Sequence, residues 1–135
     1  MKQDSFVADR ELIHALEKRS QPISCSAGCI LFSQGGAPSG LYIIQSGEAA
    51  LMMESASGKA VMCLHAAAGS LLGLPAIVGN QPYTMTAMAH KGSEVRFVTR
   101  NDFEDIMRGE PALYPKVLQI LAAEVGRARQ ALSEI

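Results

Sequence analysis

The sequence predicts a mainly β domain, a roll, a barrel or a sandwich, with helices before and after it. Two observations support this prediction. Short apolar runs separated by glycine-rich turns recur about every ten residues between residues 23 and 99, and a helical period appears only outside that stretch. The chain has 135 residues, 48% of them hydrophobic, which suits one domain, residues 1–135, with a substantial core.

An N-terminal helix is expected over residues 4–19. Its acidic residues precede Lys18 and Arg19, which is the order that the helix dipole favours. Pro22 ends the helical segment because proline disfavours helix for the residue before it. The apolar residues that can share one face of this helix are Phe6, Val7, Ile13 and Leu16.

Six short apolar runs are the expected strands of the β section. The turns between them are rich in glycine and serine, and glycine interrupts every window long enough for a helix. Residues 23–99 are therefore expected to be β structure. The predicted strands are Cys29–Phe32, Leu41–Ile44, Ala49–Met53, Ala60–Leu64, Thr84–Ala89 and Glu94–Val98.

The helical period returns over residues 100–135. Either Thr99 or Asn101 can cap a short first helix, because both side chains accept hydrogen bonds from helix N–H groups. Gly109–Pro111 should break that helix before a longer one begins. The apolar residues of the short helix are Phe103, Ile106 and Met107.

The last helix carries apolar residues spaced alternately three and four apart, the pattern of a coiled-coil seam. Because this seam is narrow and strict, it predicts a homodimer formed through the helix. The alternative is that the stripe packs on the β core of its own chain. The seam residues are Leu118, Leu121, Val125, Ala128, Leu132 and Ile135.

Charge and hydropathy exclude several classes of protein. With 12 basic and 13 acidic residues the net charge is −1, which gives no general electrostatic reason to bind nucleic acid. No apolar run is long enough to span a membrane, and the charged N-terminus lacks the apolar stretch of a signal peptide. We expect a soluble, cytoplasmic protein without direct nucleic-acid or membrane partners.

Three cysteines, Cys25, Cys29 and Cys63, are too few for a disulfide framework or a four-thiolate iron–sulfur cluster. No further Cys or His lies close enough in the sequence to complete a tetrahedral zinc set with Cys25 and Cys29. We expect the three thiols to be reduced and buried, because free cysteine behaves as a small hydrophobic residue.

The histidines give no sign of an enzyme. His14, His65 and His90 lack the close His-x-His pair with a following Glu that a metal-binding cupin barrel uses. His65 and His90 can meet in space, but two separately satisfied histidines are the simpler expectation. No nucleophile elbow or phosphate loop is present. We therefore predict no catalytic residues and no metal ligands.

Methionines gather in the β section. They favour core filling, because methionine adapts to irregular gaps, and an apolar ligand pocket is the alternative. These residues are Met52, Met53, Met62, Met85 and Met88.

Three glycine-marked segments occur in a characteristic order: Gly28–Gly35, then Leu41–Glu48, then Gly69–Gly73. Their glycines suit tight turns between strands, because glycine adopts a positive φ freely. In this order the segments resemble the cyclic nucleotide-binding domain of the bacterial catabolite activator and of the regulatory subunit of cAMP-dependent protein kinase. The resemblance covers nearly the whole chain. It implies a β-roll (a double-stranded jelly roll) flanked by an N-terminal helix and a long C-terminal helix.

The resemblance also implies a phosphate-binding cassette, in which a short helix follows a Gly-Glu pair and an Arg lies nine residues after the Glu. Here Leu74 stands at the Glu position and Tyr83 at the Arg position. Each lost hydrogen bond to a charged group costs about 1.5–3 kcal/mol, so ordinary cAMP or cGMP binding is not expected. The candidate cassette residues are Gly73, Leu74, Pro75, Ala76, Tyr83, Thr84 and Thr86.

The function implied is that of a non-enzymatic regulatory sensor with a degenerate cassette. A cyclic nucleotide or another small anion is the candidate ligand, with no cofactor assigned. Arg127 and Arg129 are cations that the last helix could bring over it, but a solvated face beside the seam is the simpler expectation for both. One alternative is a protein-interaction module with a collapsed pocket, filled by Leu74, Met85 and Tyr83. Another is a transcription regulator that has lost its DNA-binding half, because no helix-turn-helix follows the last helix.

Overall fold

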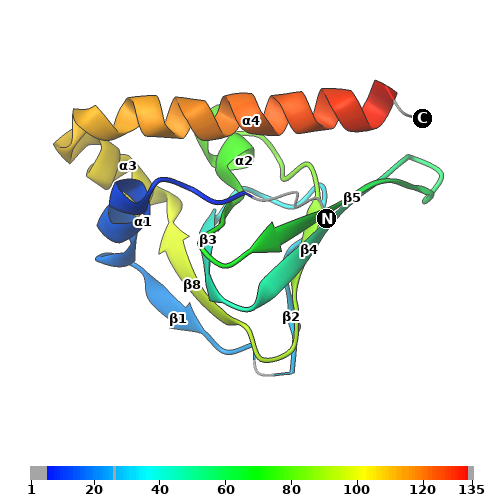
Figure 1. The fold of residues 1–135 in the computed structure, drawn as a ribbon, viewed down its shortest axis with the longest axis horizontal. Helices are drawn as coiled ribbons and strands as arrows, with labels where there is room; N and C mark the ends of the chain where they lie inside the picture. The colour runs from blue at the N-terminus through cyan, green and yellow to red at the C-terminus, as the bar shows by residue number, and fades with distance from the viewer. Residues whose placement is uncertain (1–5, 26, 134–135) are drawn as a thin grey trace.

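Two antiparallel four-stranded sheets pack face to face, and helices cover the outer side of one of them (Figure 1). The computed structural model describes residues 6–25 and 27–133, and side chains up to residue 126. The elements in chain order are α1 (Arg10–Glu17), β1 (Gln21–Ile23), β2 (Cys29–Phe32), β3 (Gly40–Ser46), β4 (Glu48–Glu54), β5 (Ala60–Ala67), β6 (Leu71–Leu72), α2 (Leu74–Gly79), β7 (Thr86–Ala89), β8 (Glu94–Thr99), α3 (Arg100–Gly109), the 3-10 helix η1 (Pro111–Leu113) and α4 (Tyr114–Ser133).

The first sheet has the strand order β1-β8-β3-β6 and the second has the order β2-β7-β4-β5. In the second sheet Leu51 lies opposite Leu64 on one neighbour and opposite Ala87 on the other. In the first, Tyr42 lies opposite Phe97. Strands that neighbour each other in space are therefore often distant in sequence, as expected for a β-roll.

The hydrophobic core has two parts, separated by the first sheet. Strand β3 contributes to both, because successive side chains of a strand point to opposite faces. Tyr42 and Ile44 lie in the part between the two sheets, whereas Leu41 and Ile43 lie in the part between the first sheet and the helices. Strand β3 thus packs against both the second sheet and the helical layer.

The predicted mainly β fold is confirmed, and so are the six predicted strands, each within a few residues. Strands β1 and β6 were not expected. The N-terminal helix begins at Arg10, where Asp9 caps it by accepting hydrogen bonds from two backbone N–H groups. The expectation that Phe6 and Val7 belong to this helix is wrong, because Phe6 packs between the sheets and Val7 forms a bridge with Ser70. Residues 4 and 5 lie outside the described part.

The C-terminal helices follow the expected division. Thr99 caps α3 by accepting a hydrogen bond from the Asp102 N–H group, as one of the two predictions had it. The chain then passes through η1, which begins at Pro111, into α4. No helix among the described residues has the length and apolarity needed to cross a lipid bilayer.

Helix α4 runs along one side of the molecule and extends past the sheets toward the β4–β5 hairpin (Figure 1). Val117 and Ile120 are buried against the domain, whereas Leu118 and Val125 are 63% and 56% exposed. Leu121 is partly buried. The side chains of the remaining predicted seam residues, Ala128, Leu132 and Ile135, lie outside the described part, as do the side chains of Arg127 and Arg129.

The prediction of three reduced, buried cysteines is wrong except for the burial of Cys25 and the free thiol of Cys63. Cys25 and Cys29 form a disulfide, and Cys63 is free and exposed on β5. The turn before β2, with a positive φ at Gly28, brings the Cα atoms of the pair to 5.4 Å, a normal separation for a disulfide.

Candidate functional site

The cassette segment begins where β6 leads into α2. Gly73 caps this six-residue helix with a φ of 94°, a conformation that strongly favours glycine. Pro75 lies in the first turn, where its missing N–H group costs no helix hydrogen bond. A short helix thus follows Gly73, at the place where the resemblance implies one.

Tyr83 occupies the interior next to this helix. Its side chain is 3% exposed and stacks on Phe32, with ring centroids 4.1 Å apart. A Cβ atom placed on Gly73 would lie 3.2 Å from the Tyr83 ring. The ring therefore lies directly against the start of α2.

The hydroxyl of Tyr83 is fully engaged by the chain itself. It donates a 2.7 Å hydrogen bond to the Gly40 carbonyl and accepts hydrogen bonds from the N–H groups of Gly40 and Ser39, at 3.1 and 3.2 Å. Burial raises the pKa of the nearby Tyr42 phenol above its ordinary value, Tyr83 adds to the rise, and a hydrogen bond to Ser39 opposes it. These surroundings favour neutral groups over charged ones.

Leu74 and Ala76 belong to different parts of the core. Leu74 is fully buried and packs with the helical layer, so it does not line the space between the sheets. Ala76 packs with Tyr83 in the part between the sheets, and Met85 lies against that part. Of the three residues expected to fill a collapsed pocket, Tyr83 and Met85 lie on the side between the sheets, whereas Leu74 is buried on the side of the helices.

The two threonines of the cassette also separate. Thr84 is exposed, whereas Thr86 is partly buried at the start of β7. The Thr86 hydroxyl accepts a 3.0 Å hydrogen bond from the Gln34 N–H group. One of the two hydroxyls is thus already used to hold the chain together.

The methionines divide between the two faces of the second sheet. Met62 is buried between the sheets, and Met53 and Met85 pack against that core, as core filling predicts. Met88 is 42% exposed on the outer face. Core filling therefore accounts for the inward-facing ones only.

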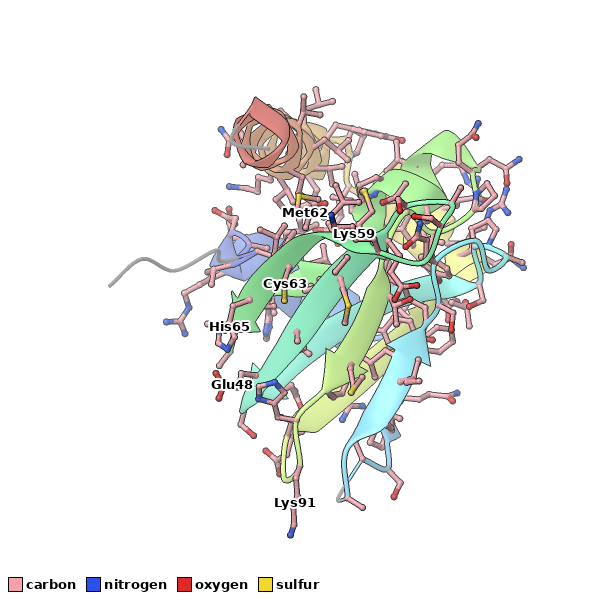
Figure 2. All side chains as sticks on the ribbon, turned by 90° about the vertical axis from the view of Figure 1, so that its right-hand side faces the viewer. Glu48, Lys59, Met62, Cys63, His65 and Lys91 are labelled. Carbon is pink, nitrogen blue, oxygen red and sulfur yellow. A yellow bond between two sulfur atoms is a disulfide. The ribbon has the colours of Figure 1, made fainter. Side chains whose placement is uncertain are left out.

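The expectation that His65 and His90 are separate is wrong, because the structure brings both of them to Glu48. The side chains of Glu48 and His65 lie together at one end of the second sheet, and Lys91 extends away from them (Figure 2). The His65 Nε2 atom is 2.5 Å from one carboxylate oxygen of Glu48, and the His90 Nδ1 atom is 3.4 Å from the other. Glu48 was missed in the sequence, where only the alternation of faces along β4 and β5 could have indicated the grouping.

Comparison with protein families gives a match to the model described as the cyclic nucleotide-binding domain, over residues 22–110. This span contains the two sheets and the cassette, from β1 to the end of α3. Comparison with curated protein sequences finds no match.

Solved structures with the same fold include the catabolite activator protein of Thermus thermophilus, at 24% identity and a TM-score of 0.68, over 93% of this chain and 58% of that one. The c-di-GMP responsive global regulator CLP of Xanthomonas campestris is 12% identical with a TM-score of 0.72, over 93% and 62% of the two chains. The regulatory domain of PKA from Toxoplasma gondii, crystallised with cAMP, is 19% identical with a TM-score of 0.65, over 88% and 43%. The chain thus spans less than two thirds of each of these structures, and the likeness concerns the fold.

Proposed function

Since the chain belongs to the cyclic nucleotide-binding domain family, we propose that it is a regulatory sensor domain whose interior does not hold cAMP or cGMP in the family's usual way. The observation that carries this proposal is the position of Tyr83. Its ring lies against the start of α2, and its hydroxyl is bound to the Gly40 backbone.

Electrostatics support the same conclusion. Residues 73–86 contain no Lys, Arg, Asp or Glu, so the cassette offers a cyclic phosphate no cation and a ribose no carboxylate. Moving an unpaired charge from water into a buried site costs several kcal/mol. A nucleotide would also have to displace Tyr83 from its contacts with Phe32 and Gly40.

The proposal includes a homodimer formed through α4. Support comes from the division of that helix into two sides, because Val117 and Ile120 pack on the domain while Leu118 and Val125 remain exposed. Large exposed apolar side chains at seam spacing are typical of a helix that pairs with another. A signal received by the β-roll would reach the partner through the buried side of the same helix.

A second candidate function is a protein-interaction module with a filled interior. It is favoured by the packing of Phe32, Tyr83 and Met85 between the sheets, which leaves the aromatic rings in contact with each other. Such a module would exchange protein partners on its surface without any small ligand inside.

Titration calorimetry with cAMP, cGMP and c-di-GMP tests the proposal. We expect no saturable heat with any of them up to millimolar concentration. A matched pair of variants sharpens the test: Tyr83→Arg places a cation in the cassette, and Tyr114→Arg places one at an exposed position on α4. We expect a gain in nucleotide binding only from Tyr83→Arg. Saturable micromolar binding by the unaltered chain would contradict the proposal whatever the variants do.

A further inference from the structure

Three potential metal ligands converge on the outer face of the second sheet. Glu48 begins β4, His65 lies near the end of β5, and His90 follows β7. Ala50 on β4 lies opposite His65 on β5 and opposite Met88 on β7. Glu48 precedes Ala50 by two residues, and His90 follows Met88 by two residues, just past the end of β7. Because side chains alternate between faces, all three point to the same side, away from the core.

The ligand atoms of the three side chains all lie within 4.8 Å of one another. Around a tetrahedral zinc ion with bonds of about 2.0–2.2 Å, neighbouring ligand atoms are about 3.3–3.6 Å apart. The His90 to Glu48 distance of 3.4 Å already matches this spacing, and the 2.5 Å between His65 and Glu48 would have to widen. Binding an ion would therefore require the His65 and Glu48 side chains to move apart.

The backbone beneath the cluster is held firmly. The Glu48 N–H group donates to the Ser93 hydroxyl, and that hydroxyl donates to the Glu48 carbonyl, both at 3.1 Å. The same carbonyl accepts a 2.9 Å hydrogen bond from the His90 N–H group. Gly47 permits this close approach, because a Cβ atom there would lie 2.2 Å from the Ser93 hydroxyl. The backbones of two of the three residues are thus fixed relative to each other before any ion arrives.

We propose that Glu48, His65 and His90 bind a divalent first-row transition metal ion, for which zinc is the test ion. Two imidazoles and one carboxylate are a ligand set that zinc, copper, nickel and ferrous iron accept. The His65 Nε2 and His90 Nδ1 atoms and the Glu48 carboxylate coordinate the ion.

Coordination by three side chains leaves at least one position of the ion open. The side chains of both histidines are 43% exposed and that of Glu48 is 47% exposed, so this position faces water. A contact between carboxylate and imidazole that is this exposed to water is weak, so a metal ion has little to displace.

The proposal is independent of whether the interior cassette binds a nucleotide, because the cluster lies on the opposite side of the second sheet from Tyr83. Cys63 lies two residues before His65 on the same face, and Figure 2 shows it on the same strand, farther from Glu48. Its thiolate is not part of the proposed set.

Calorimetric titration of untagged, metal-free chain with zinc chloride tests the site. We expect one ion per chain, and an affinity loss of at least about 10–100-fold in His65→Ala and in His90→Ala, since even outer-sphere changes cost that much. His14→Ala is the matched control, because it removes the third histidine of the chain, which is exposed on α1. Cys63→Ser should also leave the affinity unchanged.

Proton NMR of the imidazole rings gives a second readout that needs no substitution. Zinc should shift the ring signals of His65 and His90 and leave those of His14 in place. With cobalt in place of zinc, we expect no thiolate-to-cobalt absorption band. Failure to bind zinc below millimolar concentration would overturn the proposal. So would a zinc affinity of His65→Ala and His90→Ala equal to that of the unaltered chain, or binding of one ion per two chains.

Discussion

The interior cassette and the outer-face cluster use polar groups in opposite ways. In the interior, the Tyr83 hydroxyl is buried and has its hydrogen-bond partners in the backbone of Gly40 and Ser39. On the outer face, Glu48 and the two histidines meet one another and remain open to water. Within one roll, Tyr83 is thus part of the core, while Glu48, His65 and His90 bring potential ligand atoms together on the surface.

Replacing Tyr83 should have the largest effect on the free energy of unfolding, because its side chain is buried in the core. We expect Tyr83→Ala to lower the free energy of unfolding by about 3–5 kcal/mol, through the cavity and the lost contacts with Phe32. Tyr83→Phe keeps the ring and should cost about 1–3 kcal/mol, because the Gly40 backbone groups lose a partner. Urea unfolding measures both.

The exposed Tyr114→Phe is the control for these variants, and its effect should stay within about 0.5 kcal/mol. If Tyr83→Ala unfolds at the same urea concentration as the unaltered chain, the interior is not packed around this ring.

The two sides of α4 differ in the same way, one being buried and the other exposed. We expect Ile120→Ala to destabilise the fold by about 2–5 kcal/mol, because Ile120 is buried against the domain. Leu118→Ala should change the unfolding of dilute chain by less than about 0.5 kcal/mol and weaken self-association. Sedimentation over a range of concentrations measures that association. Unaltered association in Leu118→Ala would count against the dimer.

The outer-face cluster should tolerate substitution in the absence of metal. We expect His65→Ala to change the free energy of unfolding by no more than about 0.5 kcal/mol, because its partner Glu48 is exposed to water. Excess zinc should raise the thermal unfolding temperature of the unaltered chain but not that of His65→Ala, because an ion stabilises a folded protein only if it binds to it. Thermal unfolding with and without zinc distinguishes the two. A large loss in the metal-free state would indicate that the cluster is structural.

The smallest effect concerns an exposed contact between α1 and α4. Lys116 Nζ lies 3.1 Å from the Asp9 carboxylate, and this hydrogen bond holds the pKa of Asp9 below its ordinary value of 3.8. The contribution to stability is present above that value and is lost as the pH falls through the lower value of the folded state. The free energy of unfolding of Asp9→Asn should therefore fall slightly less on acidification than that of the unaltered chain, as urea unfolding at a series of pH values measures. The same pH dependence of the free energy of unfolding in both proteins would contradict this contact.

Local patterns in the sequence predict the strands well, because each pairs a short apolar run with a glycine turn. Strands β1 and β6 cannot be predicted in this way, because they have only three and two residues. They are strands because β1 pairs with β8 and β6 pairs with β3. The start of α1 shifts for a related reason. Phe6 fits a helical face, but burial between the sheets and the bridge of Val7 to Ser70 decide its conformation.

The candidate site is predictable only in part. The family pattern locates Tyr83 and Leu74, but not the direction of their side chains, because α2 lies between two parts of the core. Only the packed structure places Leu74 with the helices and Tyr83 between the sheets. The meeting of Glu48 with His65 and His90 depends on the register of three strands, which no local pattern contains.

Strand β5 is an edge of the second sheet, with β4 as its partner among the described strands. Its eight residues include no Asp, Glu, Lys or Arg. An uncharged edge of this length is a template to which a strand of another molecule can add. Along these eight residues, the edge therefore carries no fixed charge that would oppose the addition of a strand from another molecule.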